Sequence, residues 1–307
     1  MTLRIAINGF GRIGRNVLRA LYTQGYRRDL QIVAINDLGD SAINAHLLKF
    51  DTVHGTFDAD VQHDHESLTV NGDRISVSAI RNPAELPWAA EKIDVVFECT
   101  GLFTDRAKAA AHISAGARKV IISATAKGAD ATVVYGVNHD ILRQSHQIIS
   151  NASCTTNCLA PLAQVLHREL GIESSLMTTI HAYTNDQNLL DNYHKGPRRG
   201  RSAAINMVIT STGAGTAVSK AIPSLKDKLT ANAVRVPTPN GSLAIMNLTV
   251  KKDVTLDQMN ELVRQAALNG DLVNQIHYQI DPELVSSDII GDTCCSVFDS
   301  NATIVSN

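Results

Sequence analysis

The sequence predicts a two-domain α/β protein, with a doubly wound parallel sheet in residues 1–152 and an α+β domain with a largely antiparallel sheet in residues 153–307. Three observations predict this fold class. In the first half, short apolar strands alternate with helical segments, as in a parallel sheet covered on both faces. A glycine-rich turn joins the first strand to the first helix. Beyond Asn151 the strands lengthen and alternate apolar with polar residues, which is typical of an antiparallel sheet with one covered face.

The first half is read as repeated strand–helix units. Residues 3–9 form a short apolar strand, and residues 12–25 form a helix that stops at a glycine and has one apolar face (Ile13, Val17, Leu18 and Leu21). Residues 105–117 form a second helix, and further strands are expected at 30–37, 92–101 and 117–125. Parallel strands joined in this way are connected by right-handed crossovers.

The second half contains long strands at residues 174–184, 230–240 and 242–252. Helical segments accompany them at residues 154–170, 213–223 and 255–268. Within the first of these helices, Pro161 should introduce a kink or limit the regularity, because proline cannot donate the helical hydrogen bond.

Composition excludes several function classes. The net charge of −2 gives no overall field that would attract nucleic acid or a membrane surface. The apolar runs are strand-sized, far below the roughly 20 residues that span a bilayer, and the N-terminus enters a strand pattern directly, so no signal peptide is expected. One basic segment, residues 194–201, lacks the interleaved aromatic residues of a nucleic-acid patch.

Five cysteines, an odd number, favour a reducing cytoplasm over a disulfide framework.

The turn after the first strand has the spacing of a dinucleotide-binding loop. Gly9, Gly11 and Gly14 form a G-x-G-x-x-G that follows a strand and opens a helix, and Asp37 ends the next strand. The first glycine permits the tight turn, the second lets a pyrophosphate approach the backbone, and the third lets helix and strand pack closely. A carboxylate at Asp37 would bind both ribose hydroxyls and repel a 2′-phosphate, so the pattern favours NAD over NADP (a ligand-free glycine turn is the alternative).

Two cysteines four residues apart raise three alternatives. Cys154 follows a plausible N-cap, Ser153, and could be a nucleophile with His181 as its base; Cys158 on the same helical face suits structural burial. A zinc site is disfavoured, because the spacing is unusual and Cys294 and Cys295 point to opposite faces of a strand, so we expect no metal. An isolated thiol is only about 3% ionised at pH 7, and a helix N-terminus supplies about 0.3–1 kcal/mol. A nucleophilic Cys154 therefore needs an imidazolium beside it.

Five segments occur in an order that resembles a known family. They are "INGFGRIGR", "SNASCTTNCLAPLA", "HAYTNDQ", "TSTGAGTAVSKAIP" and "VRVPTPN". In this order they are similar to the phosphorylating (type I) glyceraldehyde-3-phosphate dehydrogenases, and the likeness runs from residue 1 to Asn307. The resemblance implies a Rossmann-type NAD-binding domain followed by a catalytic domain.

The same resemblance implies a mechanism. Cys154 corresponds to the thiolate that attacks the aldehyde of glyceraldehyde 3-phosphate, and His181 to the base that accepts a proton and stabilises the tetrahedral oxyanion. Hydride transfer to NAD leaves a thioester on Cys154, and inorganic phosphate then releases 1,3-bisphosphoglycerate. The family reading places the protein in glycolysis or gluconeogenesis, and it places the basic segment 194–201 at subunit contacts of a homotetramer.

Binding residues follow by similarity alone. The site for the attacking phosphate would be formed by Ser153, Thr155, Thr212 and Gly213. The site for the phosphate of the substrate would be formed by Thr184, Asp186, Arg199 and Arg235. The NAD contacts, besides the glycines, would be Arg12, Ile13, Asp37, Arg81 and Ser123.

Three departures from the family pattern leave alternatives. Family members continue with a strand and a final helix that these 307 residues do not include, and Asn192-Tyr193 stands where Leu-Pro is usual near the adenine ribose. The segment "DATVVYGVNHD" is similar to erythrose-4-phosphate dehydrogenases, whereas Thr184 is typical of the glyceraldehyde-3-phosphate enzymes. An erythrose-4-phosphate dehydrogenase and a truncated, weakly active NAD-binding homologue are therefore the alternative functions.

Overall fold

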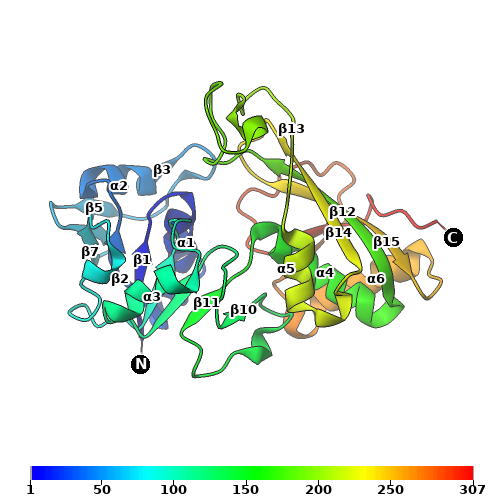
Figure 1. The fold of residues 1–307 in the computed structure, drawn as a ribbon, viewed down its shortest axis with the longest axis horizontal. Helices are drawn as coiled ribbons and strands as arrows, with labels where there is room; N and C mark the ends of the chain where they lie inside the picture. Colours follow the sequence, from blue (N-terminus) through cyan, green and yellow to red (C-terminus); the bar gives the residue numbers. More distant parts are fainter. Residues whose placement is uncertain (1, 307) are drawn as a thin grey trace. The chain divides into compact units, whose positions relative to one another are not determined.

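The structure is a computed structural model that describes residues 2–306. Its chain forms two compact units. Unit 1 holds the chain up to Val133 together with Ile141–Ala152, and unit 2 holds Val134–Asp140 together with the chain from Ser153 (Figure 1). Each unit is described by itself. We propose that the domain boundary lies between residues 152 and 153, as the sequence predicts.

Unit 1 is built on a nine-stranded sheet in the order β10-β11-β9-β8-β1-β2-β7-β6-β5. Its strands are β1 (Leu3–Asn8), β2 (Leu30–Asn36), β5 (Val61–His63), β6 (Ser67–Val70), β7 (Asp73–Ser78), β8 (Val95–Glu98), β9 (Lys119–Ile122), β10 (Ala131–Thr132) and β11 (Ile148–Ser150). All neighbouring pairs are parallel except β5–β6 and β6–β7. The chain builds the sheet outward from β1 in one direction through β2, and later in the other direction through β8. The strand order therefore reverses between β1 and β8, which confirms the Rossmann-type prediction.

Both faces of this sheet carry an apolar core. Along β1, Ile5 and Ile7 belong to a cluster that includes Leu18 of α1 (Arg12–Thr23) and Leu48 of α2 (Ser41–Lys49). Ala6, which points to the opposite face, belongs to a second cluster around Trp88 that includes Ala109 of α3 (Arg106–Ser114). Strands covered on both faces read as continuous apolar runs, which is why the sequence predicted them. The sequence did not predict the antiparallel edge β5–β7 or the hairpin β3 (Phe50–Asp51) and β4 (Gly55–Thr56).

Unit 2 centres on a four-stranded sheet in the order β13-β14-β12-β15. The strands are β12 (Ile172–Ala182), β13 (Val208–Thr210), β14 (Leu229–Val236) and β15 (Ser242–Val250). The pairs β12–β15 and β13–β14 are antiparallel and β12–β14 is parallel. The prediction of a largely antiparallel sheet is therefore confirmed, with one parallel pair within it.

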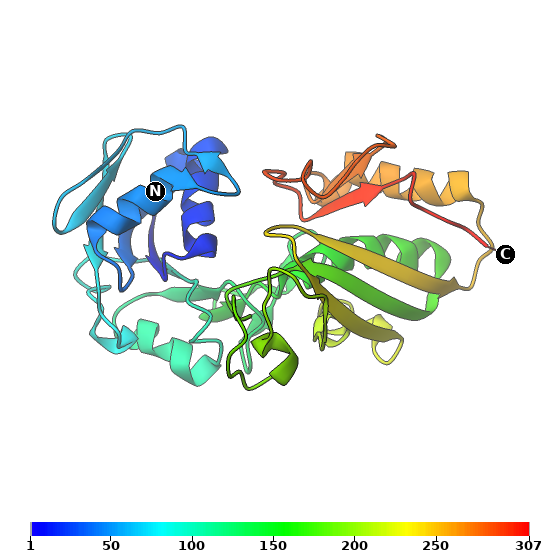
Figure 2. The ribbon, with the colours of Figure 1, turned by 90° about the horizontal axis from the view of Figure 1, so that it is seen from above.

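Three helices accompany this sheet, as predicted. They are α4 (Cys154–Leu170), α5 (Ala214–Ala221) and α6 (Leu256–Leu268), and α4 packs against both others and against β12 and β15. A parallel pair, β16 (Ile276–Gln279) and β17 (Ser296–Asp299), lies beside α6 and α4 (Figure 2). Helix α4 is continuous through Pro161. The short 3-10 helices are η1 (Tyr26–Arg28), η2 (Pro83–Glu85), η3 (His139–Ile141), η4 (Pro197–Gly200), η5 (Pro223–Leu225) and η6 (Gly270–Leu272).

Candidate functional site

The glycine loop of unit 1 lies between β1 and α1, where its three glycines have different surroundings. A Cβ on Gly9, whose φ is +90°, would lie 2.7 Å from the Thr100 amide nitrogen, and one on Gly14 would lie 2.2 Å from the Gly9 carbonyl oxygen. A Cβ on Gly11 would meet no atom of the described residues within 4 Å. Two positions are thus closed by packing, whereas Gly11 faces open space at the N-terminus of α1. That arrangement fits a pyrophosphate, which needs close backbone approach and free N–H donors.

The carboxylate of Asp37 is held at the end of β2. It accepts hydrogen bonds from the backbone amides of Phe10 (2.7 Å) and Gly39 (3.0 Å), so it lies beside the glycine loop. The other NAD contacts implied by the resemblance lie at the same edge of the sheet. Arg12 and Ile13 open α1, exposed Arg81 follows β7, and Ser123 follows β9. Because the carboxyl ends of parallel strands meet at one edge, these residues lie at the edge of the sheet where dinucleotides bind in folds of this kind. The residues present therefore fit NAD.

In unit 2, the structure brings Cys154 and His181 together. Ser153 caps α4 by accepting a hydrogen bond from the Thr156 amide (3.2 Å), which places Cys154 in the first turn. His181 lies near the end of β12, and its Nε2 is 3.3 Å from the Cys154 Sγ. The His181 Nδ1 lies 2.7 Å from the Ala182 carbonyl oxygen. A proton on Nδ1 bonds that carbonyl, which leaves the Nε2 lone pair directed at the thiol.

Opposing influences set the pKa of the Cys154 thiol. Although the residue as a whole is exposed, protein atoms packed around its sulfur raise the pKa by desolvation. The hydrogen bond and charge of His181, followed by hydrogen bonds from Thr155, lower it by more, so the pKa lies below its ordinary value. Cys158 differs, because burial raises the pKa of its thiol. One thiol is therefore activated, and the other, 3.8 Å from the Ser296 hydroxyl oxygen, is packed.

Two arginines converge next to His181. Arg235 on β14 pairs in register with His181 on β12, and its NH1 donates to the Ala182 carbonyl (2.9 Å) and to the Thr184 hydroxyl (3.4 Å). Burial and then the charge of Arg199 lower the pKa of Arg235, so the two guanidinium groups are close enough to repel. The buried Nε of Arg235 has no hydrogen-bond partner among the described residues. Two like charges and a free buried donor are the features of an anion site.

Arg199 is held by neighbours that orient its guanidinium. Its NH1 donates to Asp186, its Nε donates to the Thr210 hydroxyl (3.0 Å), and Asp186 also lies 3.7 Å from the His194 Nε2. Desolvation raises the pKa of Asp186, but the hydrogen bond and the charge of Arg199 lower it by more, so the pKa lies below its ordinary value. The four residues Thr184, Asp186, Arg199 and Arg235 thus form one connected cluster.

The residues expected to bind the attacking phosphate lie at two helix starts. Ser153 and Thr155 stand at the start of α4, and Thr212 and Gly213 precede α5, which packs against α4. The Thr212 hydroxyl accepts a hydrogen bond from the Ala214 amide (3.2 Å). Helix N-termini bear partial positive charge and free N–H groups, so this pairing also suits an anion.

Sequence reasoning missed several supporting residues. The Ala182 carbonyl, Thr210 and His194 contact the groups above; they lie within segments that the sequence analysis singled out, but it predicted no role for them. Ala152, fully buried just before α4, has a left-handed φ of 58°, which is a strained conformation for alanine. Within residues 2–306, no group of three or more His, Cys, Asp or Glu side chains could hold a metal ion.

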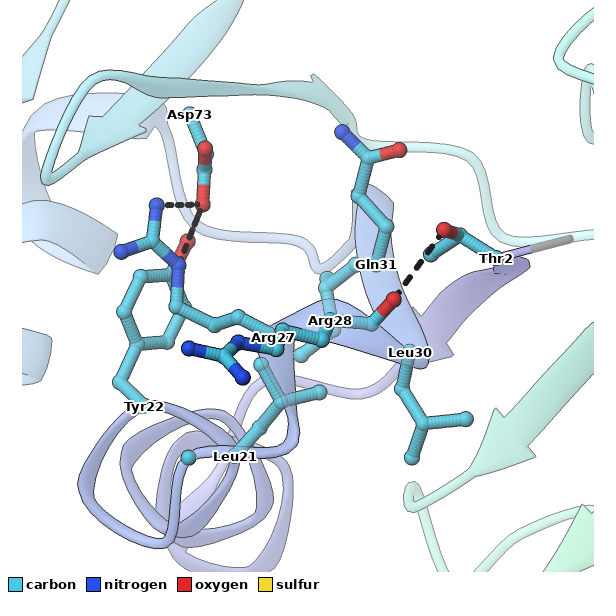
Figure 3. A pocket seen from close by; sticks show the side chains of 10 residues that line it. Thr2, Leu21, Tyr22, Arg27, Arg28, Leu30, Gln31 and Asp73 are labelled. Atoms are coloured by element: carbon cyan, nitrogen blue, oxygen red, sulfur yellow. Dashed lines mark hydrogen bonds and ion pairs between the residues drawn. The ribbon is translucent and has the colours of Figure 1, made fainter.

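A separate pocket of about 510 Å³ lies at the opposite, amino-terminal end of β1 and β2 (Figure 3). Arg27 donates to Asp73 there (2.6 Å) and its guanidinium lies 4.8 Å from the centre of the Tyr22 ring. Arg27 and Asp73 form an ion pair in this pocket, which is distinct from the glycine loop. Of the helices in the described part of the chain, none combines the length and the apolar character needed to span a membrane.

Comparison with known proteins gives one consistent result. Residues 3–106 match the family model "Glyceraldehyde 3-phosphate dehydrogenase, NAD binding domain", and residues 153–307 match "Glyceraldehyde 3-phosphate dehydrogenase, C-terminal domain". A glyceraldehyde-3-phosphate dehydrogenase of Pseudomonas aeruginosa is 62% identical over 306 residues, which is 100% of this chain and 90% of that protein. The plasmid-encoded enzyme of Cupriavidus necator (54%) and that of Streptomyces coelicolor (51%) each align with 99% of this chain and 90% of their own length.

Proposed function

The chain belongs to the glyceraldehyde-3-phosphate dehydrogenase family, and from this premise we propose that it oxidises glyceraldehyde 3-phosphate through a thioester on Cys154. The 3.3 Å contact between Cys154 and His181 carries the proposal. The relatives cited above bear the glyceraldehyde-3-phosphate name and so favour this substrate over erythrose 4-phosphate. NAD is the cofactor of this family.

His181 takes two proton-transfer roles in this proposal. Its Nε2 first accepts the Cys154 proton, and the thiolate attacks the aldehyde carbon to form a thiohemiacetal. Nε2 next gives this proton to the oxyanion of the thiohemiacetal, which becomes a hydroxyl. The neutral imidazole can then withdraw the proton of that hydroxyl. Bound NAD supplies the hydride acceptor that makes oxidation to the thioester possible. Inorganic phosphate attacks the thioester carbonyl, the Cys154 thiolate leaves, and an acyl phosphate is released.

The two anion sites have separate roles. The cluster of Arg235, Arg199 and Thr184 would bind the phosphate of the substrate, with Asp186 orienting Arg199. The helix starts that carry Ser153, Thr155, Thr212 and Gly213 would bind the attacking inorganic phosphate. Charge supports the first assignment, because a dianion would offset the burial of Arg235 and its repulsion by Arg199, which together lower the pKa of Arg235.

Self-association is supported by one face of the unit 2 sheet. The residues Ile209, Val234, Ile180 and Leu243 lie in one row across the four strands, on the face opposite His181 and Arg235. On the same face, Leu243 is 58% exposed and Ile209 is 61% exposed. An apolar sheet face of this kind is typical of a protein interface. We propose that this face contributes to a homotetramer, and that the protein acts in the cytoplasm with a role in glycolysis or gluconeogenesis.

The function is tested by steady-state kinetics. kcat/KM is measured with glyceraldehyde 3-phosphate and erythrose 4-phosphate, with NAD and NADP, in the presence and absence of inorganic phosphate. We expect highest kcat/KM for glyceraldehyde 3-phosphate with NAD, and turnover that requires phosphate. A preference for erythrose 4-phosphate would contradict the substrate assignment.

The covalent route has its own matched pair of variants. Cys154→Ser should abolish turnover and the rapid reaction with iodoacetate, because the hydroxyl is not ionised near neutral pH. Cys158→Ser should retain most of the activity, since its thiol is packed and has a raised pKa. Full activity in Cys154→Ser would exclude the thioester.

A further inference from the structure

A buried chain of polar side chains runs through unit 1 below the glycine loop. Glu98 ends β8 and is only 1% exposed. Its Oε2 accepts hydrogen bonds from the Asn8 Nδ2 (2.6 Å) and from His112 Nε2 (3.0 Å). Its Oε1 accepts hydrogen bonds from the Thr100 amide (2.8 Å) and the Thr100 hydroxyl. Four donors on two oxygens match the full capacity of an ionised carboxylate.

The network continues on both sides of Glu98 with defined donors. Trp88 Nε1 donates to His112 Nδ1 (2.9 Å), which leaves the proton of the neutral imidazole on Nε2, facing Glu98. On the other side, the Asn8 Oδ1 accepts from Asn36 Nδ2 (2.7 Å) at the end of β2. Asn8, Asn36 and His112 are at most 5% exposed. A buried network with every member satisfied holds one rigid arrangement.

The network ends at the two loops that meet at the switch point of the sheet. Asn8 is followed by Gly9 of the glycine loop, and Thr100 is followed by Gly101 and Leu102. The loops touch, because a Cβ on Gly9 would lie 2.7 Å from the Thr100 nitrogen. The Thr100 hydroxyl also accepts a hydrogen bond from the Leu102 amide (3.0 Å). Among the residues that the structure describes, Glu98 is thus the side chain that bonds both the end of β1 and the loop after β8.

We propose that Glu98 is a positioning residue for NAD, which fixes the two loops at the β1–β8 switch point in the arrangement that the dinucleotide requires. Glu98 is buried and does not touch the cofactor, so it acts through Asn8 and Thr100. A rigid crevice binds more tightly than one that must be ordered on binding. The proposal rests on NAD binding at the glycine loop of unit 1.

The test is Glu98→Gln, which keeps the shape of the side chain but replaces one acceptor oxygen with a donor. At least two of the four donors then lose their partner. We expect a roughly tenfold rise in the Kd for NAD, equivalent to about 1.4 kcal/mol, measured by calorimetry. KM for NAD should rise in parallel, whereas kcat at saturating NAD and alkylation of Cys154 without NAD should stay within about twofold of the parent. In the protein without NAD, hydrogen exchange of residues 8–12 and 99–102 should accelerate.

Two control variants separate positioning from loss of stability. His112→Phe removes one donor and leaves Trp88 unpaired, but Glu98 keeps Asn8 and Thr100, so the Kd should rise less than threefold. Tyr22→Phe removes a hydrogen bond to Asp73 in the same unit but away from both loops (Figure 3), and should leave the Kd unchanged. If Glu98→Gln does not fold, Asn8→Ala removes the hydrogen bond between β1 and Glu98 and should raise the Kd for NAD in the same way.

Three outcomes would overturn the inference. They are an unchanged Kd and exchange rate in Glu98→Gln, an equal rise in Kd in His112→Phe at matched melting temperature, or an unchanged Kd in Asn8→Ala. Failure of the parent protein to bind NAD would instead contradict the cofactor assignment, so the two failures are distinguishable.

Discussion

At the scale of single residues, the site depends on how one imidazole is placed. His181 lies on β12 with its Nδ1 beside the Ala182 carbonyl and its Nε2 beside Cys154. The backbone carbonyl orients the ring and selects the tautomer, so a neutral His181 can accept the thiol proton. Desolvation raises the pKa of Cys154, but the hydrogen bond and the charge of His181, followed by hydrogen bonds from Thr155, lower it by more.

The pH dependence of thiol reactivity follows from this balance. The alkylation rate is proportional to the thiolate fraction, so the rate in the parent protein should rise through an inflection below the ordinary thiol value. His181→Gln removes the largest lowering contribution and leaves desolvation, which moves the inflection to higher pH. Iodoacetamide kinetics between pH 5 and 10 measure the shift, with His194→Gln as a control that leaves it in place. An unshifted inflection in His181→Gln would contradict the assigned pairing.

At the scale of elements, the two packed glycines and the open one explain how β1 and α1 serve a ligand. Gly14 lets α1 contact the Gly9 carbonyl, and Gly9 lets the loop approach Thr100. Gly11 has an ordinary φ of −70° and no described neighbour for a Cβ. The folded chain itself therefore does not require a glycine at position 11, which points to a ligand at this site.

Alanine substitutions distinguish these roles. Gly14→Ala forces a Cβ against a backbone carbonyl, so the free energy of unfolding should fall by about 1–3 kcal/mol, as for other overpacked sites. Gly11→Ala should leave the melting temperature unchanged but weaken NAD binding, because the methyl group occupies the space that the pyrophosphate approaches. Calorimetric melting and NAD titration of both variants provide the measurement. A melting temperature that falls equally in both variants would refute the distinction between a packing role for Gly14 and a ligand-binding role for Gly11.

The elements were largely predictable from the sequence, and the side-chain contacts were not. Helix α4 matches the predicted residues 154–170, because its cap, apolar periodicity and final glycine are local signals. Pro161 did not end it. The Cys154–His181 contact joins residues 27 apart and depends on the position of β12 beside α4, so spacing alone left it open. The antiparallel edge β5–β7 was also missed, since its strands are short and partly polar.

At the scale of the whole molecule, the sheet of unit 2 separates two kinds of surface. One face carries His181 and Arg235 and is associated with helices, and the other face carries the exposed apolar row. Because side chains alternate along each strand, the same backbone register would serve the proposed chemistry on one face and the proposed self-association on the other.

A charge placed on the apolar row should change the assembly. Leu243→Glu combined with Ile245→Glu introduces carboxylates on the exposed face of β15, and burying them against another copy is costly. We expect light scattering to show a shift from the tetrameric mass to smaller species, whereas Leu142→Glu, at an exposed position of unit 1, should leave the mass unchanged. A mass unchanged in the double variant would refute this interface.

In the proposed mechanism, the pairing of His181 with Arg235 on adjacent parallel strands would set the length of the substrate. The proposed base and the proposed phosphate-binding cation are direct partners in the register of one hydrogen-bonded ladder, so their backbones cannot move relative to each other without a register shift. A substrate must then span a fixed interval between its aldehyde carbon and its anionic end. An aldehyde with one more carbon has to fold that carbon out of the line between them. Under the proposed roles, selection by chain length would be built into the main chain, and altering it would call for changes outside the sheet.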